Sequence, residues 1–273
     1  MGNLGNQYAE LGETMRAIEH YPQAMNIFRD LKDRSSEAAL LCNLGSRYAD
    51  LGQTTQALQC LNDSLAIAQE TGYRLIEGGA QTFLGHLYLD QCKWEQAVRA
   101  FKQAVEIADD TANVQFQQLA RLGLAEANLY QNELSMALQM AEAAQQYDYP
   151  LENHSAPAIS GIVALRQGDR ARARDAFTAA LNQASELLSK SPQLFFALDT
   201  KALALCGLAL CENPSHIPAA KEAYRAARAL TSAPGIVARV LRLFDALAQA
   251  DAAAILVSVR PYAAGETAAS AST

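Results

Sequence analysis

Aromatic residues are scarce in this chain, at 7% of its 273 residues, and there are only 8 prolines. Alternation of polar and apolar residues, the pattern of half-buried strands, is hard to find. Half of the residues are nevertheless hydrophobic, and alanine and leucine, the strongest helix formers among them, are abundant. The composition therefore predicts an all-α protein with a core of alanine and leucine.

Other absences narrow the class of protein. The five cysteines have neither CxxC spacing nor the pattern of a zinc site, and unpaired thiols are typical of a reducing, cytoplasmic compartment. No apolar run approaches the roughly 18 residues of a membrane helix, and no basic stretch followed by an apolar one marks a secretory leader at the N-terminus. We therefore expect a cytoplasmic protein that makes no membrane contact.

The charge is of the wrong sign for nucleic acid. The net charge is -7, whereas a nucleic-acid-binding protein usually carries a basic surface. Residues 1–150 hold 10 Lys and Arg against 19 Asp and Glu, while residues 151–273 hold 12 against 10. The two parts therefore present different surfaces to a partner, one acidic and one slightly basic.

Catalytic patterns are also missing. Gly78, Gly79 and Gly85 lack the strand–turn–helix setting of a phosphate-binding loop. The four histidines lie far apart without an HExxH arrangement, and no Ser or Cys has a recognisable base in its pattern. The sequence thus predicts no enzyme, no cofactor and no metal site, although a catalytic group assembled between distant segments stays open as an alternative.

What the chain does contain is a repeat. Small residues recur every 40 positions at Gly5, Gly45, Gly85 and Ala125, and alanine recurs in the same way at Ala17, Ala57, Ala97 and Ala137. Tyrosine keeps the interval at Tyr8, Tyr48 and Tyr88. A fixed period of this length indicates a solenoid built from one stacked helical unit. We expect each glycine to mark a close approach of two helices, with the tyrosine filling the space beside it.

The repeating segments resemble a known family. They read LGNQYAELGETMRAIEHYPQAMNIF from Leu4, LGSRYADLGQTTQALQCLNDSLAIA from Leu44 and LGHLYLDQCKWEQAVRAFKQAVEIA from Leu84. These segments are similar to the tetratricopeptide repeat, in the 40-residue variety of kinesin light chain, G-protein-signalling modulators and the sensor arrays of bacterial signal-transduction ATPases and MalT-like regulators. The resemblance implies a right-handed α-α superhelix of five to six helical hairpins with a C-terminal capping helix.

The regularity fades along the chain. Residues 1–147 carry four regular units, and residues 148–157, with two prolines, predict an inter-repeat loop or hinge. Degenerate units and the capping helix, at 235–250, are expected within residues 158–262, and a disordered tail over 263–273. Met1 opens the first unit about three residues before Leu4, so we also expect the chain to be the C-terminal portion of a longer protein or a shortened one.

The resemblance also implies a binding surface. In this family the first helix of each unit lines a concave face that binds extended peptides or partner helices. The matching positions here are Asn3, Asn6, Glu10, Asn43, Ser46, Asp50, Thr82, Phe83, His86, Asp90, Glu126 and Tyr130. The positions of the carboxylate clamp found in chaperone-binding members do not match apart from the asparagines, so that partner class is disfavoured.

Three acidic residues of this set recur at the repeat spacing. Stacking of the units should align Glu10, Asp50 and Asp90 in a row of carboxylates, here called the acidic ladder. Such a row predicts a protein or peptide partner with basic residues, steered by charge and sensitive to salt. The alternative is that helix ends carry acidic residues for solubility alone.

These observations predict a non-enzymatic protein–protein interaction module that binds a peptide or partner domain in a concave, acidic groove. A second interpretation, also from the resemblance, is a regulatory or inhibitory sensor array of a larger bacterial signal-transduction ATPase or MalT-like transcriptional regulator.

Overall fold

The structure is a computed structural model that describes residue 8 and residues 11–266. This part of the chain is all-helical. Its α-helices, numbered from α2, are α2 (Thr14–Asp30), α3 (Arg34–Asp50), α4 (Thr54–Thr71), α5 (Arg74–Asp90), α6 (Trp94–Thr111), α7 (Val114–Tyr130), α8 (Leu134–Ala144), α9 (Ser155–Arg166), α10 (Arg170–Lys190), α11 (Phe195–Cys211), α12 (Ile217–Leu230), α13 (Pro234–Ala248) and α14 (Arg260–Ala264). Two short 3₁₀ helices lie at Pro214–His216 and Ile255–Ser258.

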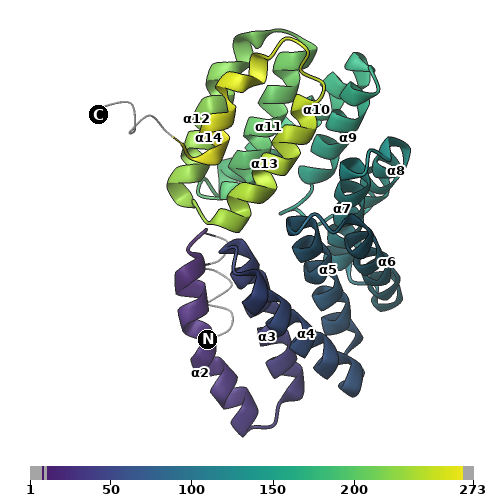
Figure 1. The fold of residues 1–273 in the computed structure, drawn as a ribbon, viewed down its shortest axis with the longest axis vertical. Coiled ribbons are helices and arrows are strands. Elements are labelled where there is room, and N and C mark those ends of the chain that lie inside the picture. The colour runs from purple at the N-terminus through teal and green to yellow at the C-terminus, as the bar shows by residue number, and fades with distance from the viewer. Residues whose placement is uncertain (1–7, 9–10, 267–273) are drawn as a thin grey trace.

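Consecutive helices form antiparallel hairpins that stack along a curved solenoid (Figure 1). The pairs are α3 with α4, α5 with α6, α7 with α8, α9 with α10 and α11 with α12, and α2 is the second helix of the first unit. The expected fold class is thereby confirmed. Gly52 and Gly168 end the first helices of their units with φ of +71° and +83°, a conformation that glycine adopts without strain.

Gly45 and Gly85 do mark close helix approaches, but their neighbour is different from the one expected, while Gly5 lies outside the described residues. A Cβ on Gly45 would lie 2.6 Å from Leu61 Cγ, and one on Gly85 would lie 2.6 Å from Phe101 Cε1. Leu61 and Phe101 come from the second helix of the hairpin, whereas the tyrosines are half-buried nearby. The large residue four positions after the repeated alanine therefore fills the space beside Gly45 and Gly85.

Each of two phenylalanines joins two successive hairpins. Phe101 of α6 also contacts Gly123 of α7, where an added Cβ would lie 2.2 Å from the ring. Phe177 of α10 lies in the same way between Gly161 of α9 and Gly207 of α11, at 2.7 Å and 2.4 Å from a Cβ at these positions. A phenylalanine ring packed between two glycines thus determines both how the two helices of one hairpin pack and how that hairpin packs on the next unit.

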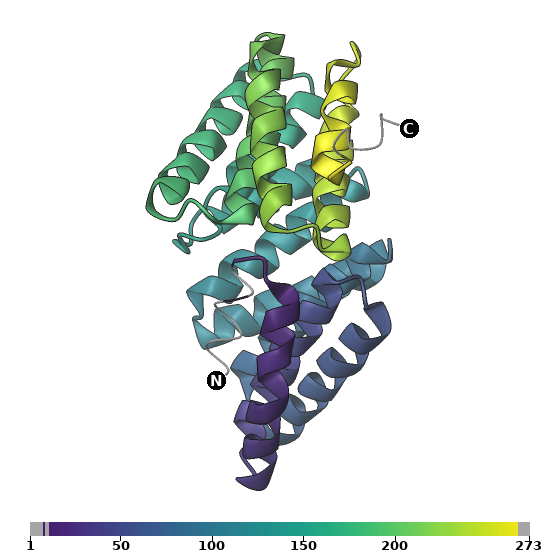
Figure 2. The same ribbon diagram turned by 90° about the vertical axis from the view of Figure 1, so that its left-hand side faces the viewer.

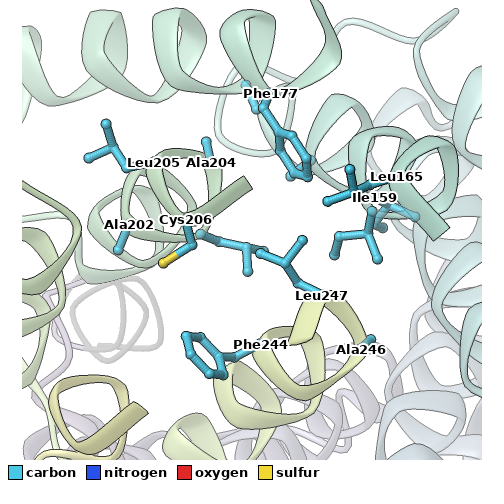
Figure 3. Packing of buried hydrophobic residues seen from close by; sticks show 14 of the residues in the cluster. Ile159, Leu165, Phe177, Ala202, Ala204, Leu205, Cys206, Phe244, Ala246 and Leu247 are labelled. Carbon is cyan, nitrogen blue, oxygen red and sulfur yellow. The ribbon is translucent and has the colours of Figure 1, made fainter. Parts of the chain in front are cut away.

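The largest core cluster lies in the C-terminal units (Figure 3). Phe177 points into it from α10, Ile159 and Leu165 come from α9, and Phe244 and Leu247 come from α13. The side chains of Phe177, Phe244 and Leu247 are at most 1% exposed. Helix α13 is therefore anchored in the core of the solenoid rather than resting on its surface.

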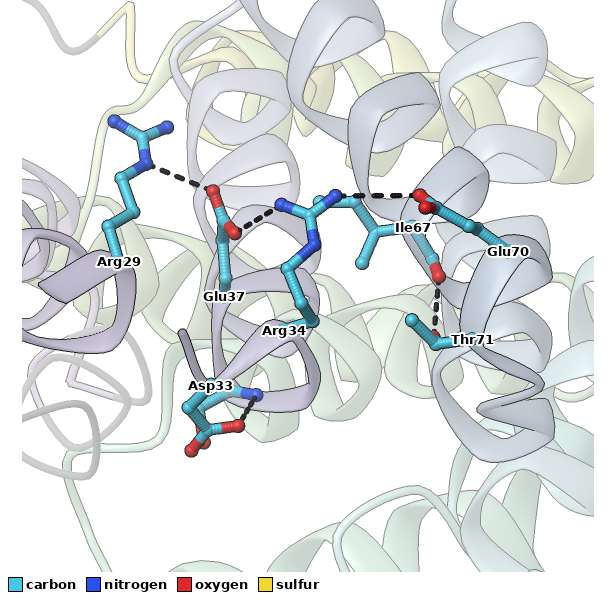
Figure 4. A network of polar contacts seen from close by, with 8 residues as sticks. Arg29, Asp33, Arg34, Glu37, Ile67, Glu70 and Thr71 are labelled. Carbon is cyan, nitrogen blue, oxygen red and sulfur yellow. Dashed lines mark hydrogen bonds and ion pairs between the residues drawn. The ribbon is translucent and has the colours of Figure 1, made fainter. Parts of the chain in front are cut away.

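Polar contacts tie the N-terminal units together (Figure 4). The Glu37 carboxylate of α3 accepts from Arg29 of α2 at 2.9 Å and from Arg34 at 2.6 Å, and Arg34 also faces Glu70 of α4 at 3.6 Å. The buried Ser64 hydroxyl of α4 donates to the Ala38 carbonyl of α3 at 2.7 Å. These contacts join three successive helices at one edge of the stack.

Two segments differ from regular hairpins. The connection between α8 and α9 covers residues 145–154 in turns, so α9 begins at Ser155, inside the segment expected as a loop. Pro157 lies in the first turn of α9, where its missing N–H costs no helical hydrogen bond. At the C-terminus, α14 includes Ala263 of the expected tail, and residues 267–273 lie outside the described residues.

After α12 the chain turns back and helix α13 approaches the N-terminal units (Figures 1 and 2). Helix α13 contacts α3 and α5 as well as α9 and α11. The turn that leads into α13 also contacts the turn before α2 in the first unit, since a Cβ on Gly12 would lie 2.9 Å from Thr231 Cβ. The predicted closing helix at 235–250 therefore exists, but it lies against the first helices of earlier units instead of extending the stack.

Candidate functional site

Helix α13 packs against the concave side through backbone contact. A Cβ on Gly235 would lie 2.0 Å from the carbonyl oxygen of Ala49 and 2.9 Å from that of Asp50, both at the end of α3. Pro234 begins the helix beside Gly52. The N-terminal end of α13, which carries a partial positive charge, thus meets the C-terminal end of α3, which carries a partial negative charge.

The acidic ladder has a basic partner within the chain. Asp50, which is 4% exposed, lies 3.2 Å from Arg47 Nη1 and 2.9 Å from Arg239 Nη2 of α13. Asp90 lies 3.4 Å from Arg239 Nε and forms a second ion pair with Arg242. The carboxylates that the sequence assigns to an external basic partner are therefore paired with the chain's own α13. Glu10, the third residue of the ladder, lies outside the described residues.

These ion pairs lie in a region of low solvent access. Burial alone would lower the pKa of Arg239, but the Asp50 and Asp90 carboxylates raise it above its ordinary value. His86 lies beside this network with its ring edge-to-face against Phe101, at 5.0 Å between centroids. Burial, with the positive field of Arg239, lowers the pKa of His86 to about 4. His86 is therefore neutral at pH 7, and the cations of the network are Arg47, Arg239 and Arg242.

Beside the network lies a cavity of about 480 Å³, here called the central cavity. This volume lies within the range of small-ligand sites. The wall is formed by α3, α5, α7, the 145–154 segment, the start of α11 and α13. Gln115, on its rim, is exposed, so the cavity is open to solvent on that side. Among the lining residues are Phe83, Leu119, Phe195, Phe196, Ile236, Val240 and Leu243, which make much of the wall apolar.

The predicted groove residues divide into four groups. Six of them line the central cavity, namely Asn43, Ser46, Asp50, Phe83, His86 and Glu126. Tyr130 lines a second, smaller cavity of about 260 Å³ with Trp94 and Arg242. Thr82 is fully buried and donates to the Gly78 carbonyl at 2.8 Å, and Asp90 is held by α13. Asn3, Asn6 and Glu10 lie outside the described residues.

Sequence reasoning missed the part of the cavity wall that comes from outside the first four units. Glu152 belongs to the segment expected as a loop, Asp199 to α11, and Arg239 to α13. One feature of the sequence could have pointed to these residues. Residues 151–273 have a slight positive charge, which complements the negative charge of residues 1–150. Without the curvature of the solenoid, however, no pattern shows that Arg239 faces Asp50.

Two carboxyl groups of the central cavity lack a cation. Glu126 makes no ion pair or hydrogen bond within the described part of the chain, although Arg242 and Arg239 lie near enough to influence it. The Glu152 carboxylate accepts a hydrogen bond from the Ser155 hydroxyl at 2.9 Å and from no other side chain among the described residues. Burial raises the pKa of each group to about 7, and the charge of Glu152 also raises the pKa of Glu126. The cavity therefore carries uncompensated acidic groups.

A third carboxyl group reaches the cavity from α11. Asp199, which is 7% exposed, forms an ion pair of 2.5 Å with Arg228 through Oδ2. Its other oxygen, Oδ1, is buried without a hydrogen-bond partner among the described residues. Burial raises the pKa of Asp199 to about 7, while Arg228 acts in the opposite direction. A buried acceptor without a donor is unfavourable, so a donor supplied by a ligand would stabilise this position.

The raised pKa of Glu126 makes stability depend on pH. Its folded value of about 7 lies above the ordinary 4.5, so this group favours folding fully below pH 4.5 and progressively less as pH rises through 7. Glu126→Gln mimics the protonated form at every pH. We expect this change to raise the free energy of unfolding by about 1–2 kcal/mol at pH 8 and to leave it nearly unchanged at pH 5. Urea unfolding at both pH values measures the difference.

The exposed Glu106 of α6 is the control for this prediction. Glu106→Gln should change stability equally, and little, at both pH values. If Glu126→Gln behaved in the same way as Glu106→Gln, the acidic character assigned to the central cavity would be wrong.

Comparison with known proteins finds family models that match parts of the chain and solved structures with a similar fold. Residues 1–70 and 82–115 each match a family model described as tetratricopeptide repeat. The structure of the Rap conjugation gene regulator of plasmid pLS20, in complex with the Phr* peptide, superposes with a TM-score of 0.67 at 14% identity, over 92% of this chain and 73% of that one. BtubC (BKLC) from P. vanneervenii superposes with a TM-score of 0.57 at 16% identity, over 88% of this chain and 91% of that one. A comparison with curated protein sequences found no match.

Residues 1–70 and 82–115 are therefore identified as tetratricopeptide repeats. At these identities the two solved structures establish the likeness of fold alone. Within the described residues, no helix has both the length and the apolar character needed to cross a bilayer.

Proposed function

We propose that this protein is a non-enzymatic interaction module that binds a peptide segment of a partner at the concave face, in the central cavity. The observation that carries the proposal is the convergence of side chains from α3, α5 and α7, the first helices of three successive units, on this one cavity. The similarly folded Rap regulator is described in complex with a peptide, which supports a peptide as the bound element.

The charge of the cavity favours a basic partner. The carboxylates of Asp50 and Asp90 are compensated by Arg239 and Arg242, so the acidic ladder is not the contact surface that we propose. Glu126 and Glu152 take this role, because neither has a cation within ion-pair distance among the described residues. Charge complementarity at such groups increases the association rate and specificity more than it increases affinity.

Selection from a random peptide library on the full chain tests the proposal. We expect the selected peptides to be enriched in Lys and Arg, and their affinity to fall with salt as the charges are screened. The double variant Glu126→Gln with Glu152→Gln should reduce binding about tenfold or more.

The matched control is Glu95→Gln with Glu106→Gln, two exposed positions on α6, which should bind as the unchanged protein does. Selection of peptides without basic residues, or equal binding by both double variants, would show that the acidic cavity is not the peptide site.

A further inference from the structure

The geometry points to a primary ammonium group on an aliphatic body as the chemical element that the central cavity recognises. This inference rests on the cavity of the proposed function but not on the partner's being a protein. The same chemistry occurs in a lysine side chain, in the N-terminus of a peptide and in a free polyamine.

The acceptors belong to three different elements of the cavity wall. Glu126 comes from α7, Glu152 from the 145–154 segment, and Asp199 from α11. An ammonium group has three N–H donors arranged around a single nitrogen, which suits acceptors on separate elements. A guanidinium group is planar and pairs best side by side with one carboxylate. The spread of the acceptors therefore favours an ammonium over a guanidinium.

The unpartnered carboxylate oxygen of Asp199 supports a ligand site in the central cavity. Asp199 Oδ1 is buried and accepts no hydrogen bond in the described part of the chain, while Oδ2 of the same group is satisfied by Arg228. The residue is 7% exposed and lines the cavity, so water access to it is limited. A donor brought in by the ligand would satisfy this oxygen, which the protein's own described side chains do not.

The walls suit the body that carries the ammonium. Phe195 and Phe196 meet edge to face at 5.5 Å between centroids, and both line the cavity with Phe83. Aliphatic carbons of the ligand would pack on these rings, and the rings attract a nearby cation through their negative faces. Ile236, Val240 and Leu243 of α13 form the facing wall. Because α13 occupies the concave side, the cavity admits a side chain or a short ligand rather than a helix.

Calorimetric titration of the full chain with matched small probes tests the inference. Lysine blocked at both its α-amino and carboxyl ends keeps a free ε-ammonium, and its Nε-acetyl form has a neutral amide instead. We expect the free ammonium to bind about tenfold or more tightly than the acetylated probe, and more tightly than the equally blocked arginine. Glu126→Gln with Glu152→Gln should abolish the difference, whereas Glu95→Gln with Glu106→Gln should preserve it.

Titration with spermidine distinguishes a free polyamine from a peptide as the source of the ammonium group. Tighter binding of spermidine than of blocked lysine would assign the site to free polyamines, and the reverse order would assign it to a peptide.

Equal affinity for the free and acetylated lysine, equal or tighter binding of the arginine probe, or no binding of any amine up to about 10 mM would overturn the inference. Amine binding with no selection of peptides would instead sustain the inference and refute the proposed function. Selection of peptides whose binding requires arginine, but neither lysine nor a free N-terminus, would sustain the proposed function and overturn the inference.

Discussion

Replacing Asp90 by alanine is expected to lower the free energy of unfolding by about 3–5 kcal/mol. Asp90 is paired with both Arg239 and Arg242 of α13, and its loss leaves Arg242, whose side chain is 19% exposed, without an ion-pair partner among the described residues. The unpaired cation accounts for most of the cost, because its removal from water is no longer compensated. Urea unfolding followed by circular dichroism measures the effect.

A double-mutant cycle isolates the interaction itself. Asp90→Ala, Arg242→Ala and the double variant should give a coupling energy of about 1–3 kcal/mol. The control cycle uses Asp245 and Arg260, a pair at 3.0 Å whose side chains are 50% and 49% exposed, where we expect at most about 1 kcal/mol. A coupling no larger than that of the control pair would contradict the packing of α13 against Asp90.

Gly235→Ala is expected to destabilise the protein by about 3 kcal/mol. The new Cβ would lie 2.0 Å from the backbone oxygen of Ala49, and a backbone atom inside a helix cannot move aside as the end of a side chain can. The start of α13 must therefore shift away from α3, which moves Ile236 and Arg239 in the wall of the central cavity. We expect amine or peptide binding to weaken together with stability.

Ala238→Ser is the matched control, because residue 238 is exposed on the same helix. Its effect should stay within about 0.5 kcal/mol, with binding unchanged. Hydrogen exchange of the α13 amides would locate the change, since the Gly235→Ala variant should exchange faster there than the control. Unaltered stability of Gly235→Ala would mean that α13 does not touch the end of α3.

The repeat made the solenoid predictable from local pattern. The 40-residue spacing of Gly45 and Gly85 identified close helix approaches, because a glycine within a helix lowers stability unless another group occupies its space. The sequence pattern predicted that tyrosine side chains fill the space beside these glycines, whereas the side chains of Leu61 and Phe101 occupy it. Spacing along the chain shows that two helices approach closely, but the direction in which each side chain leaves its helix decides which residue fills the gap.

The candidate site was predicted only as far as the repeats reach. Residues at equivalent positions of α3, α5 and α7, namely Ser46, His86 and Glu126, do converge on one cavity. The contributions of Glu152 and Asp199 depend on how far the stack curves, which is the sum of small rotations between units and leaves no local pattern. The same curvature brings Arg239 to Asp50, across 189 positions of sequence.

The return of α13 to α3 changes how this solenoid responds to damage. In an open array each hairpin depends only on its immediate neighbours, so the terminal units fray first and disruption can stop partway along the stack. Here the last units hold the early ones through α13, and the array has the connectivity of a closed ring. Disruption of one hairpin therefore destabilises the hairpins on both sides of it around the ring. This connectivity favours cooperative, all-or-none unfolding over gradual unfolding from the ends.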